Sequence, residues 1–242
     1  MNCNKETAVC QLEDIPVENN QPFPVQNESS QLSFYYFGDP MCSWCWGASE
    51  ALSVLEKLCA QFNFDFNVIT GGLRAGGGDV WNENFRHFLK KEWEHISAKT
   101  GKKFSYQLLE RTFFEYDTEP ACRAVNAARE FLDKSEVYSF FKSVQHKFYV
   151  LSEDPKEMHF YKSICEEYSI PFNEFARVFN DDHARTETIT QFTLCRKWGV
   201  QSFPAVCFEY KDKLYPFFSG YISPENVISL LQNRVFPLIG RG

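Results

Sequence analysis

Residues 32–47 read LSFYYFGDPMCSWCWG and join a short apolar run to a CxxC pair. The first six residues of this stretch are mostly aromatic, which is typical of a short buried strand. The run ends in a Gly-Asp-Pro turn, and Cys42 and Cys45 follow it directly. Apolar residues then recur at intervals of three and four as far as residue 62, which predicts an amphipathic helix. We therefore expect the CxxC pair to lie where a strand passes into a helix.

A second strand is predicted at 64–69, where apolar and polar residues alternate before becoming continuously apolar. Strand, helix and strand in this order form a βαβ unit. The glycine-rich segment 71–78 matches neither of the phosphate-binding patterns GxGxxG and GxxxxGK. We therefore expect this segment to be a loop that leaves the sheet.

Helical spacing of apolar residues continues from about 80 to 186. The stripes predict helices near 85–100, 106–113, 121–132, 137–148, 155–168 and 172–179. Gly101 should end the first of these helices, while Pro120 and Pro155 should lie in first turns, with Asp154 as a cap. A helix at 185–198, strands at 205–210 and 214–219, and a last helix capped by Ser223 complete the prediction.

Residues 1–31 are predicted to be a disordered acidic tail. Nine of them are Asn or Gln, and one lysine stands against five acidic residues. Such a segment has little apolar surface to bury. Cys3 and Cys10 lie within it, and we interpret them as incidental thiols, with oxidant sensing as the alternative.

The composition is that of a globular protein, with 44% hydrophobic and 24% charged residues. A net charge of −7 argues against a nucleic-acid or anionic-membrane partner, because such partners select a basic face. No apolar run approaches the roughly 18 residues of a membrane span, and the first residues lack a signal-peptide pattern. Nine cysteines are an odd number and too few for a disulfide scaffold, so we expect a cytoplasmic protein with free or catalytic thiols.

The CxxC spacing suits thiol-disulfide exchange. The thiolate is the attacking form of cysteine, and the free N–H groups at a helix N-terminus stabilise an anion there. We therefore interpret Cys42 as the nucleophile. Three residues are nearly one helical turn, so Cys45 should return beside Cys42 and resolve the mixed disulfide.

Zinc binding and haem attachment are the competing readings of a CxxC pair. Zinc normally needs four ligands, and the sequence contains no second CxxC. The five histidines lack ligand spacing; they are His87, His95, His146, His159 and His183. Haem attachment needs a histidine directly after the pair, where this chain has Trp46. The strand-to-helix context therefore favours redox chemistry over zinc binding, haem attachment and a chance occurrence of the CxxC pattern.

A second signal is the proline in VQSFPAV, residues 200–206. Pro204 stands at the start of an apolar strand, where proline removes a ladder donor. We expect a cis Phe203-Pro204 bond that exposes the Phe203 backbone for strand-like pairing with a substrate.

Together these motifs resemble the thioredoxin superfamily and, within it, the DsbA family of thiol-disulfide oxidoreductases. The segment DPMCSWCWG at 39–47 is similar to the signature of a cytoplasmic FrnE-like branch described as predicted protein-disulfide isomerases. The segments GGLR at 71–74, RA at 123–124 with AAR at 127–129, and GV at 199–200 are similar to that branch too. The resemblance extends over about residues 32–233.

This resemblance implies a thioredoxin-like α/β fold with an all-helical domain inserted after the second strand. Residues 32–79 and 187–242 would form the thioredoxin-like domain, and residues 80–186 the insertion. Cys42 would be the exposed nucleophile, Cys45 its shielded partner and Pro204 a cis-proline facing them.

The sequence departs from the pattern of the thioredoxin superfamily in two ways. Thioredoxins carry a buried acid six residues before the first cysteine, where this chain has Tyr36. Asp39 and Glu50 are the candidates to replace that acid as proton acceptor of Cys45. The dipeptide within the pair is Ser43-Trp44, neither the Pro-His of periplasmic oxidants nor the Gly-Pro of thioredoxin, so the direction of exchange stays open.

The leading interpretation is a thiol-disulfide oxidoreductase or isomerase acting on protein or peptide disulfides, with Trp44 and Phe203 contacting the substrate. We expect no bound cofactor and no metal, with glutathione as a possible redox partner. One alternative is a glutathione-dependent transferase or isomerase of the kappa or 2-hydroxychromene-2-carboxylate isomerase type, which uses a single Ser or Cys. Another is a peptide-binding chaperone, whose function would survive Cys42→Ser.

Overall fold

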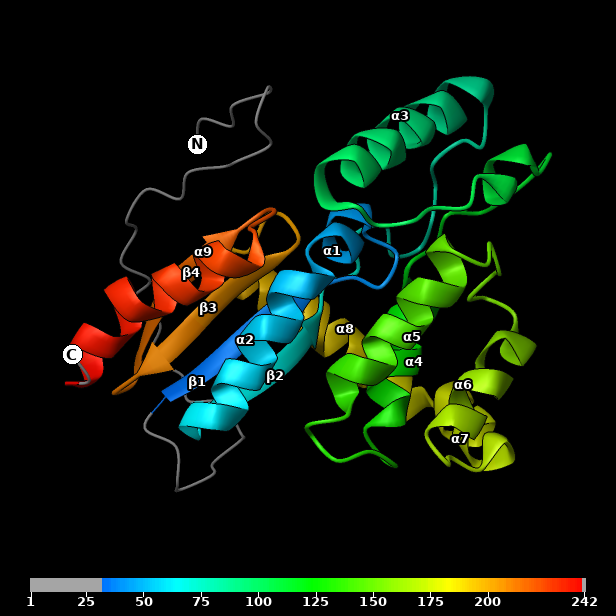
Figure 1. The fold of residues 1–242 in the computed structure, drawn as a ribbon. Coiled ribbons are helices and arrows are strands. Elements are labelled where there is room, and N and C mark those ends of the chain that lie inside the picture. The colour runs from blue at the N-terminus through cyan, green and yellow to red at the C-terminus, as the bar shows by residue number, and fades with distance from the viewer. Residues whose placement is uncertain (1–31, 241–242) are drawn as a thin grey trace.

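A four-stranded mixed sheet forms the centre of the protein (Figure 1), whose computed structural model describes residues 32–240. The strands are β1 (Leu32–Gly38), β2 (Asp65–Thr70), β3 (Ala205–Tyr210) and β4 (Lys213–Ser219). Their order across the sheet is β2-β1-β3-β4. β1 pairs in parallel with β2 and antiparallel with β3, and β3 pairs antiparallel with β4. The central strand β1 is thus held on both edges.

Helices surround this sheet and make up most of the chain between β2 and β3. They are α1 (Ser43–Gly47), α2 (Ser49–Phe62), α3 (Glu83–Thr100), α4 (Glu119–Ala128), α5 (Val137–Tyr149), α6 (Lys162–Glu167), α7 (Phe172–Asn180), α8 (Asp182–Lys197) and α9 (Pro224–Leu230). Single turns lie at Gln107–Glu110, Met158–Tyr161, Leu231–Val235 and Phe236–Ile239. Figure 1 shows α2 and α9 in front of the sheet and α8 behind it.

The aromatic run of β1 divides its side chains between the two faces, as strand geometry requires. Phe34 and Tyr36 belong to the core under α2, whereas Tyr35 and Phe37 belong to a smaller cluster with the end of α8. The Phe34 ring lies 5.2 Å from that of Phe217 on β4. Because both faces of β1 are buried, the strand that leads into the CxxC pair is fixed within the core.

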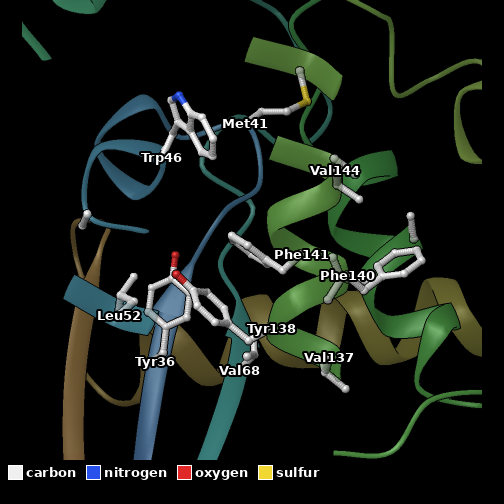
Figure 2. Close-up of a cluster of buried hydrophobic side chains, with 14 of the residues drawn as sticks. Tyr36, Met41, Trp46, Leu52, Val68, Val137, Tyr138, Phe140, Phe141 and Val144 are labelled. Atoms are coloured by element: carbon white, nitrogen blue, oxygen red, sulfur yellow. The ribbon is translucent and has the colours of Figure 1, made fainter. Parts of the chain in front are cut away.

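The helical insertion shares the core of the sheet. Figure 2 shows Tyr36 of β1, Leu52 of α2 and the α5 residues Tyr138 and Phe141 meeting in one cluster. The rings of Tyr138 and Phe141 both lie 5.6 Å from that of Tyr36. Tertiary packing therefore joins the insertion to the sheet directly.

The predicted mixed α/β fold with a helical insertion after the second strand is confirmed. The chain leaves the sheet after β2, passes through α3 to α7, and returns along α8 to β3. The proposed domain boundary between 186 and 187 falls inside α8, which packs against both α4 and β2. This helix therefore connects the two predicted domains.

Several predicted helix ends are confirmed. Gly101 takes the left-handed conformation (φ 73°) that ends α3. Ser223 accepts the N–H of Asn226 at the start of α9, with Pro224 in its first turn, and Pro120 lies in the first turn of α4. The loop prediction for 71–78 also agrees with the structure.

The helix predicted at 106–113 is wrong. Only the single turn Gln107–Glu110 forms, and Phe113, predicted on its apolar stripe, is 75% exposed. The Arg111 carbonyl accepts the indole N–H of Trp81 at 2.9 Å, and the Arg111 guanidinium donates to the Ser152 carbonyl. These tertiary hydrogen bonds hold 111–118 as irregular chain, which local periodicity cannot reveal.

Two further predictions need correction. The helix after the CxxC pair is divided at Ala48 into α1 and α2. The helix predicted from Pro155 begins instead as the turn Met158–Tyr161 and continues as α6, because Asp154 accepts the N–H and the ammonium of Lys156 rather than capping a helix. The predicted tail, with Cys3 and Cys10, lies outside the described residues.

Candidate active site

The CxxC pair lies at the end of β1 that faces the start of α1. The Gly38 carbonyl, at the end of β1, accepts the N–H of Gly71 at 2.8 Å. The chain then turns, and the N–H of Cys42 donates to the Asp39 carbonyl at 3.0 Å. Cys42 is thereby placed as the N-cap residue of α1, as the sequence predicted.

The Cys42 sulfur accepts the backbone N–H of Cys45 at 3.4 Å. This N–H is one of the donors that the first turn of a helix leaves without an intrahelical partner. The helix start therefore positions the Cys42 sulfur beside Cys45.

The Cys42 thiol also reaches the segment before β3. It lies 3.6 Å from the Phe203 carbonyl, to which it donates a hydrogen bond. The Phe203-Pro204 bond is cis, as predicted. The Pro204 carbonyl accepts the N–H of Gly220 at 2.8 Å, which ties this turn to the end of β4. Two segments 161 residues apart thus meet at one sulfur.

Cys45 lies behind Cys42, and no disulfide joins the two sulfurs in this structure. Cys42 is 4% exposed and Cys45 is 0% exposed, so Cys42 is the more accessible of the two, as expected. Cys42 is nevertheless far more buried than the exposed nucleophile that the resemblance implies. Burial raises the pKa of Cys45 well above its ordinary value, and the neighbouring Cys42 raises it further. The Asp39 backbone N–H and the Tyr36 side chain lower this pKa.

Comparison with solved structures identifies the fold. No protein-family model matches the chain, and a search of curated proteins also finds no match. A candidate protein disulfide isomerase from Nitrosomonas europaea is 29% identical, with a TM-score of 0.77 over 87% of this chain and 99% of that one. The chain resembles the DsbA-like proteins of the thioredoxin superfamily.

More distant structures share the fold of this DsbA-like protein. The cytosolic disulfide reductase DsbM from Pseudomonas aeruginosa is 22% identical, with a TM-score of 0.65 over 84% of this chain and 98% of that one. A 2-hydroxychromene-2-carboxylate isomerase is 11% identical, with a TM-score of 0.58 over 86% of this chain and 96% of that one. One fold therefore carries both chemistries that the sequence left open.

Glu50 and Asp39, the candidate proton acceptors, are both engaged elsewhere in this DsbA-like protein. The Glu50 carboxylate is 69% exposed and lies 2.8 Å from the ammonium of Lys102, which lowers its pKa. The Asp39 carboxylate is buried and accepts the N–H groups of Met41 at 2.8 Å and Leu73 at 2.6 Å. Asp39 therefore joins the active-site turn to the loop 71–78.

Replacing Asp39 by Asn should destabilise this DsbA-like protein by about 1–3 kcal/mol, since the amide group would oppose one of the two buried N–H donors. Burial raises the pKa of Asp39 in the folded protein. A carboxyl group with a raised folded-state pKa contributes stability at low pH and loses it as pH rises through that pKa. The stability difference between the parent and Asp39→Asn, measured by urea unfolding, should therefore shrink as pH rises above the ordinary carboxyl pKa of about 4. A difference that grows with pH would contradict this account.

Trp44 forms a half-buried rim beside the cysteines. Its ring lies 5.6 Å from that of His95 on α3 and 6.3 Å from that of Tyr221. The Lys99 ammonium lies 5.6 Å from the Trp44 ring and 5.4 Å from the Tyr221 ring. Sequence reasoning proposed Trp44 but missed these neighbours, because they come from α3 and from the segment after β4.

Tyr116 links the irregular segment 111–118 to the active-site turn. Its hydroxyl donates to the Met41 carbonyl at 2.9 Å, and its ring packs 6.1 Å from that of Phe85 on α3. The Arg74 guanidinium lies over both rings. No sequence signal identified Tyr116, since a helix was predicted up to residue 113. Across residues 32–240 no group of three or more His, Cys, Asp or Glu side chains could hold a metal ion.

Proposed function

We propose that this DsbA-like protein is a thiol-disulfide oxidoreductase that acts on protein or peptide disulfides through Cys42 and Cys45. The observation that carries the proposal is the position of the Cys42 sulfur, which accepts the Cys45 N–H and lies 3.6 Å from the Phe203 carbonyl. A nucleophile, a shielded second thiol and an available backbone strand thus share one site.

In the proposed reaction the Cys42 thiolate attacks a substrate disulfide. A mixed disulfide forms between Cys42 and one substrate sulfur, while the other substrate sulfur leaves as a thiolate and takes a proton. Cys45 then attacks the Cys42 sulfur, forming the Cys42–Cys45 disulfide and releasing the second substrate thiol. The adjacency of the thiols favours this two-thiol sequence over a transferase that needs only one.

The Phe203 carbonyl is the proposed anchor for the substrate backbone. In the reduced protein it accepts the Cys42 thiol, and this hydrogen bond is lost when the sulfur enters a mixed disulfide. The freed carbonyl can then accept an N–H from an extended peptide, as in strand addition. Trp44 and Tyr221 would border the same peptide on the α3 side.

Glutathione is the redox partner that we propose, in a cytoplasmic setting. A structure of the cytosolic disulfide reductase DsbM from Pseudomonas aeruginosa, 20% identical with a TM-score of 0.64, contains GSH. These likenesses support the proposal through the shared fold. Within the described part of the chain, no helix is long and apolar enough to cross a membrane.

The test is turnover of a disulfide-bonded peptide by the full chain with reduced glutathione as the only reductant. We expect catalytic formation of oxidised glutathione together with reduced peptide, at a rate proportional to protein concentration. The uncatalysed reaction with glutathione alone is the baseline. A rate equal to that baseline, with the Cys42–Cys45 disulfide left unreduced by glutathione, would refute glutathione as partner; failure with dithiothreitol as well would refute the oxidoreductase assignment.

A further inference from the structure

Tyr36 carries a buried hydroxyl that lacks a hydrogen-bond partner among residues 32–240. The side chain lies on β1 and is 0% exposed. Buried polar groups are almost always paired, and leaving one unpaired costs free energy, so each exception needs an explanation. Figure 2 shows the Tyr36 ring packed beside Tyr138, with its hydroxyl pointing toward the end of β1 where α1 begins.

Packing fixes this hydroxyl in place. The Tyr138 and Phe141 rings contact the Tyr36 ring edge-on, each with centroids 5.6 Å apart. The phenol lies so close to the backbone of Gly38 that a β-carbon there would be 2.1 Å from the hydroxyl oxygen. Only glycine at position 38 allows the ring to reach past the end of its own strand. The unpaired hydroxyl is therefore held rigidly rather than free to find another partner.

Cys45, Tyr138 and Cys42 are the titratable neighbours of the Tyr36 hydroxyl. Tyr138 donates its own hydroxyl hydrogen to the Ser49 carbonyl at 3.3 Å and forms no hydrogen bond with Tyr36. The other polar group at Cys45 is the Asp39 backbone N–H. Burial raises the pKa of Tyr36 well above its ordinary value, so the phenol keeps its proton and has it available for donation.

A thiol sulfur is a weak acceptor, whereas a thiolate is a charged and much stronger one. We propose that the Tyr36 hydroxyl is a preorganised hydrogen-bond donor for the Cys45 thiolate that forms when the mixed disulfide is resolved. In the dithiol protein the Cys45 thiol beside this hydroxyl is too weak an acceptor to satisfy it, whereas the thiolate that forms during the reaction is a strong one. Donors fixed where charge develops accelerate a step without reorganisation. This inference rests on the proposed two-thiol function and assigns its second step.

In this step Cys45 loses its proton and its thiolate attacks the Cys42 sulfur. The Cys42–Cys45 bond forms, the bond from Cys42 to the substrate sulfur breaks, and the substrate leaves with the electron pair. The proton of Cys45 ends on the departing thiolate or in water. Tyr36 keeps its own proton throughout and stabilises the negative sulfur by donation.

The test uses Tyr36→Phe in a Cys3→Ser/Cys10→Ser background, with 5,5′-dithiobis(2-nitrobenzoate) as the probe disulfide. Attack by Cys42 releases one nitrothiobenzoate, and attack by Cys45 releases a second, so stopped-flow absorbance separates the two steps. We expect the second release to slow by about ten- to hundred-fold, the effect of a hydrogen bond to a charged group, with the first release unchanged. Burial raises the pKa of Cys207, a half-buried thiol outside the site, to about 12, so its reaction should be slow.

Tyr35→Phe is the matched control, since Tyr35 occupies the opposite face of the same strand and its hydroxyl donates to Glu209 at 2.9 Å. We expect it to leave both releases unchanged. The melting temperature of Tyr36→Phe should stay close to that of its background, because the lost hydroxyl has only the weak Cys45 thiol as acceptor in the dithiol protein. A second release at the background rate would overturn the inference while leaving the two-thiol function intact. Absence of the first release in the background protein would instead refute the proposed function.

Discussion

Cys42→Ser will lose disulfide reduction by more than about a thousand-fold, because the nucleophile that starts the exchange is gone. Cys45→Ser will behave differently: its Cys42 thiol still attacks, but no second thiol resolves the product. We therefore expect a mixed disulfide between Cys42 and the peptide to accumulate in stoichiometric amount. Intact-mass spectrometry after acid quenching measures this adduct, and the glutathione-linked assay measures turnover.

Alkylation should reveal the same difference in reactivity between Cys42 and Cys45 without a substrate. Cys42 is the more accessible of the two sulfurs, and burial raises the pKa of Cys45 well above its ordinary value. Limiting iodoacetamide at neutral pH should therefore label Cys42 before Cys45, as peptide mapping can show. Cys207→Ser is the control variant, since that thiol lies on β3 away from the pair and should not affect either labelling or turnover.

The same variants distinguish the alternatives that the sequence left open. Full turnover by Cys45→Ser with glutathione would indicate a single-thiol transferase or isomerase. Suppression of aggregation by Cys42→Ser at the parent level, with no reductase activity in either protein, would indicate a chaperone. Preferential labelling of Cys45 would contradict the assignment of the nucleophile.

The junction of β1 and α1 could be predicted from sequence because independent local signals agree there. The aromatic run of 32–37, the turn-forming residues after it and the helical stripe that follows each favour one structure. Pro204 added a distant signal, and the structure places its peptide bond beside Cys42 as expected. Agreement between signals, rather than the strength of the CxxC pattern, made this part of the site predictable.

The rest of the site depends on contacts that no local pattern contains. Tyr116 binds the Met41 carbonyl from a segment where helical spacing misled the prediction. The rim beside Trp44 is built by residues that are distant in sequence and carry no motif, His95 and Tyr221 among them.

The group beside Cys45 illustrates the same limit in a single residue. The resemblance to thioredoxins places Tyr36 where those proteins have an acid, and Asp39 and Glu50 were the candidates to replace that acid. The structure engages both carboxylates elsewhere and turns the phenol toward Cys45. The direction of the Tyr36 side chain, which depends on Gly38 and on packing against α5, decides which group lies beside Cys45.

Replacing Trp93 by Ala should lower the free energy of unfolding by about 3–5 kcal/mol. Trp93 lies at the centre of α3 and is 0% exposed. Its ring stacks on Phe104 at 5.4 Å and meets Tyr149 of α5 edge-on at 5.4 Å. The indole nitrogen has no hydrogen-bond partner among the described residues, so the loss is one of packing and cavity formation.

The measurement is urea unfolding followed by circular dichroism, with Phe88→Ala as the matched control on the same helix. Phe88 is 50% exposed, and its replacement should change the free energy of unfolding by about 0.5 kcal/mol or less. For a chain of this size, the effect of Trp93→Ala corresponds to a melting temperature lower by roughly 6–20 °C.

The shape of this transition tests how the insertion is joined to the sheet. Trp93 on α3, Phe141 on α5 and Phe34 on β1 belong to one continuous buried cluster. A defect in α3 should therefore move the whole unfolding curve and leave it a single transition. Two transitions, of which only the first responds to Trp93→Ala, would show that the insertion unfolds independently. Because α3 also carries the His95 and Lys99 contacts to Trp44, a single shared transition would mean that the stability of the helical insertion sets the integrity of the active-site rim.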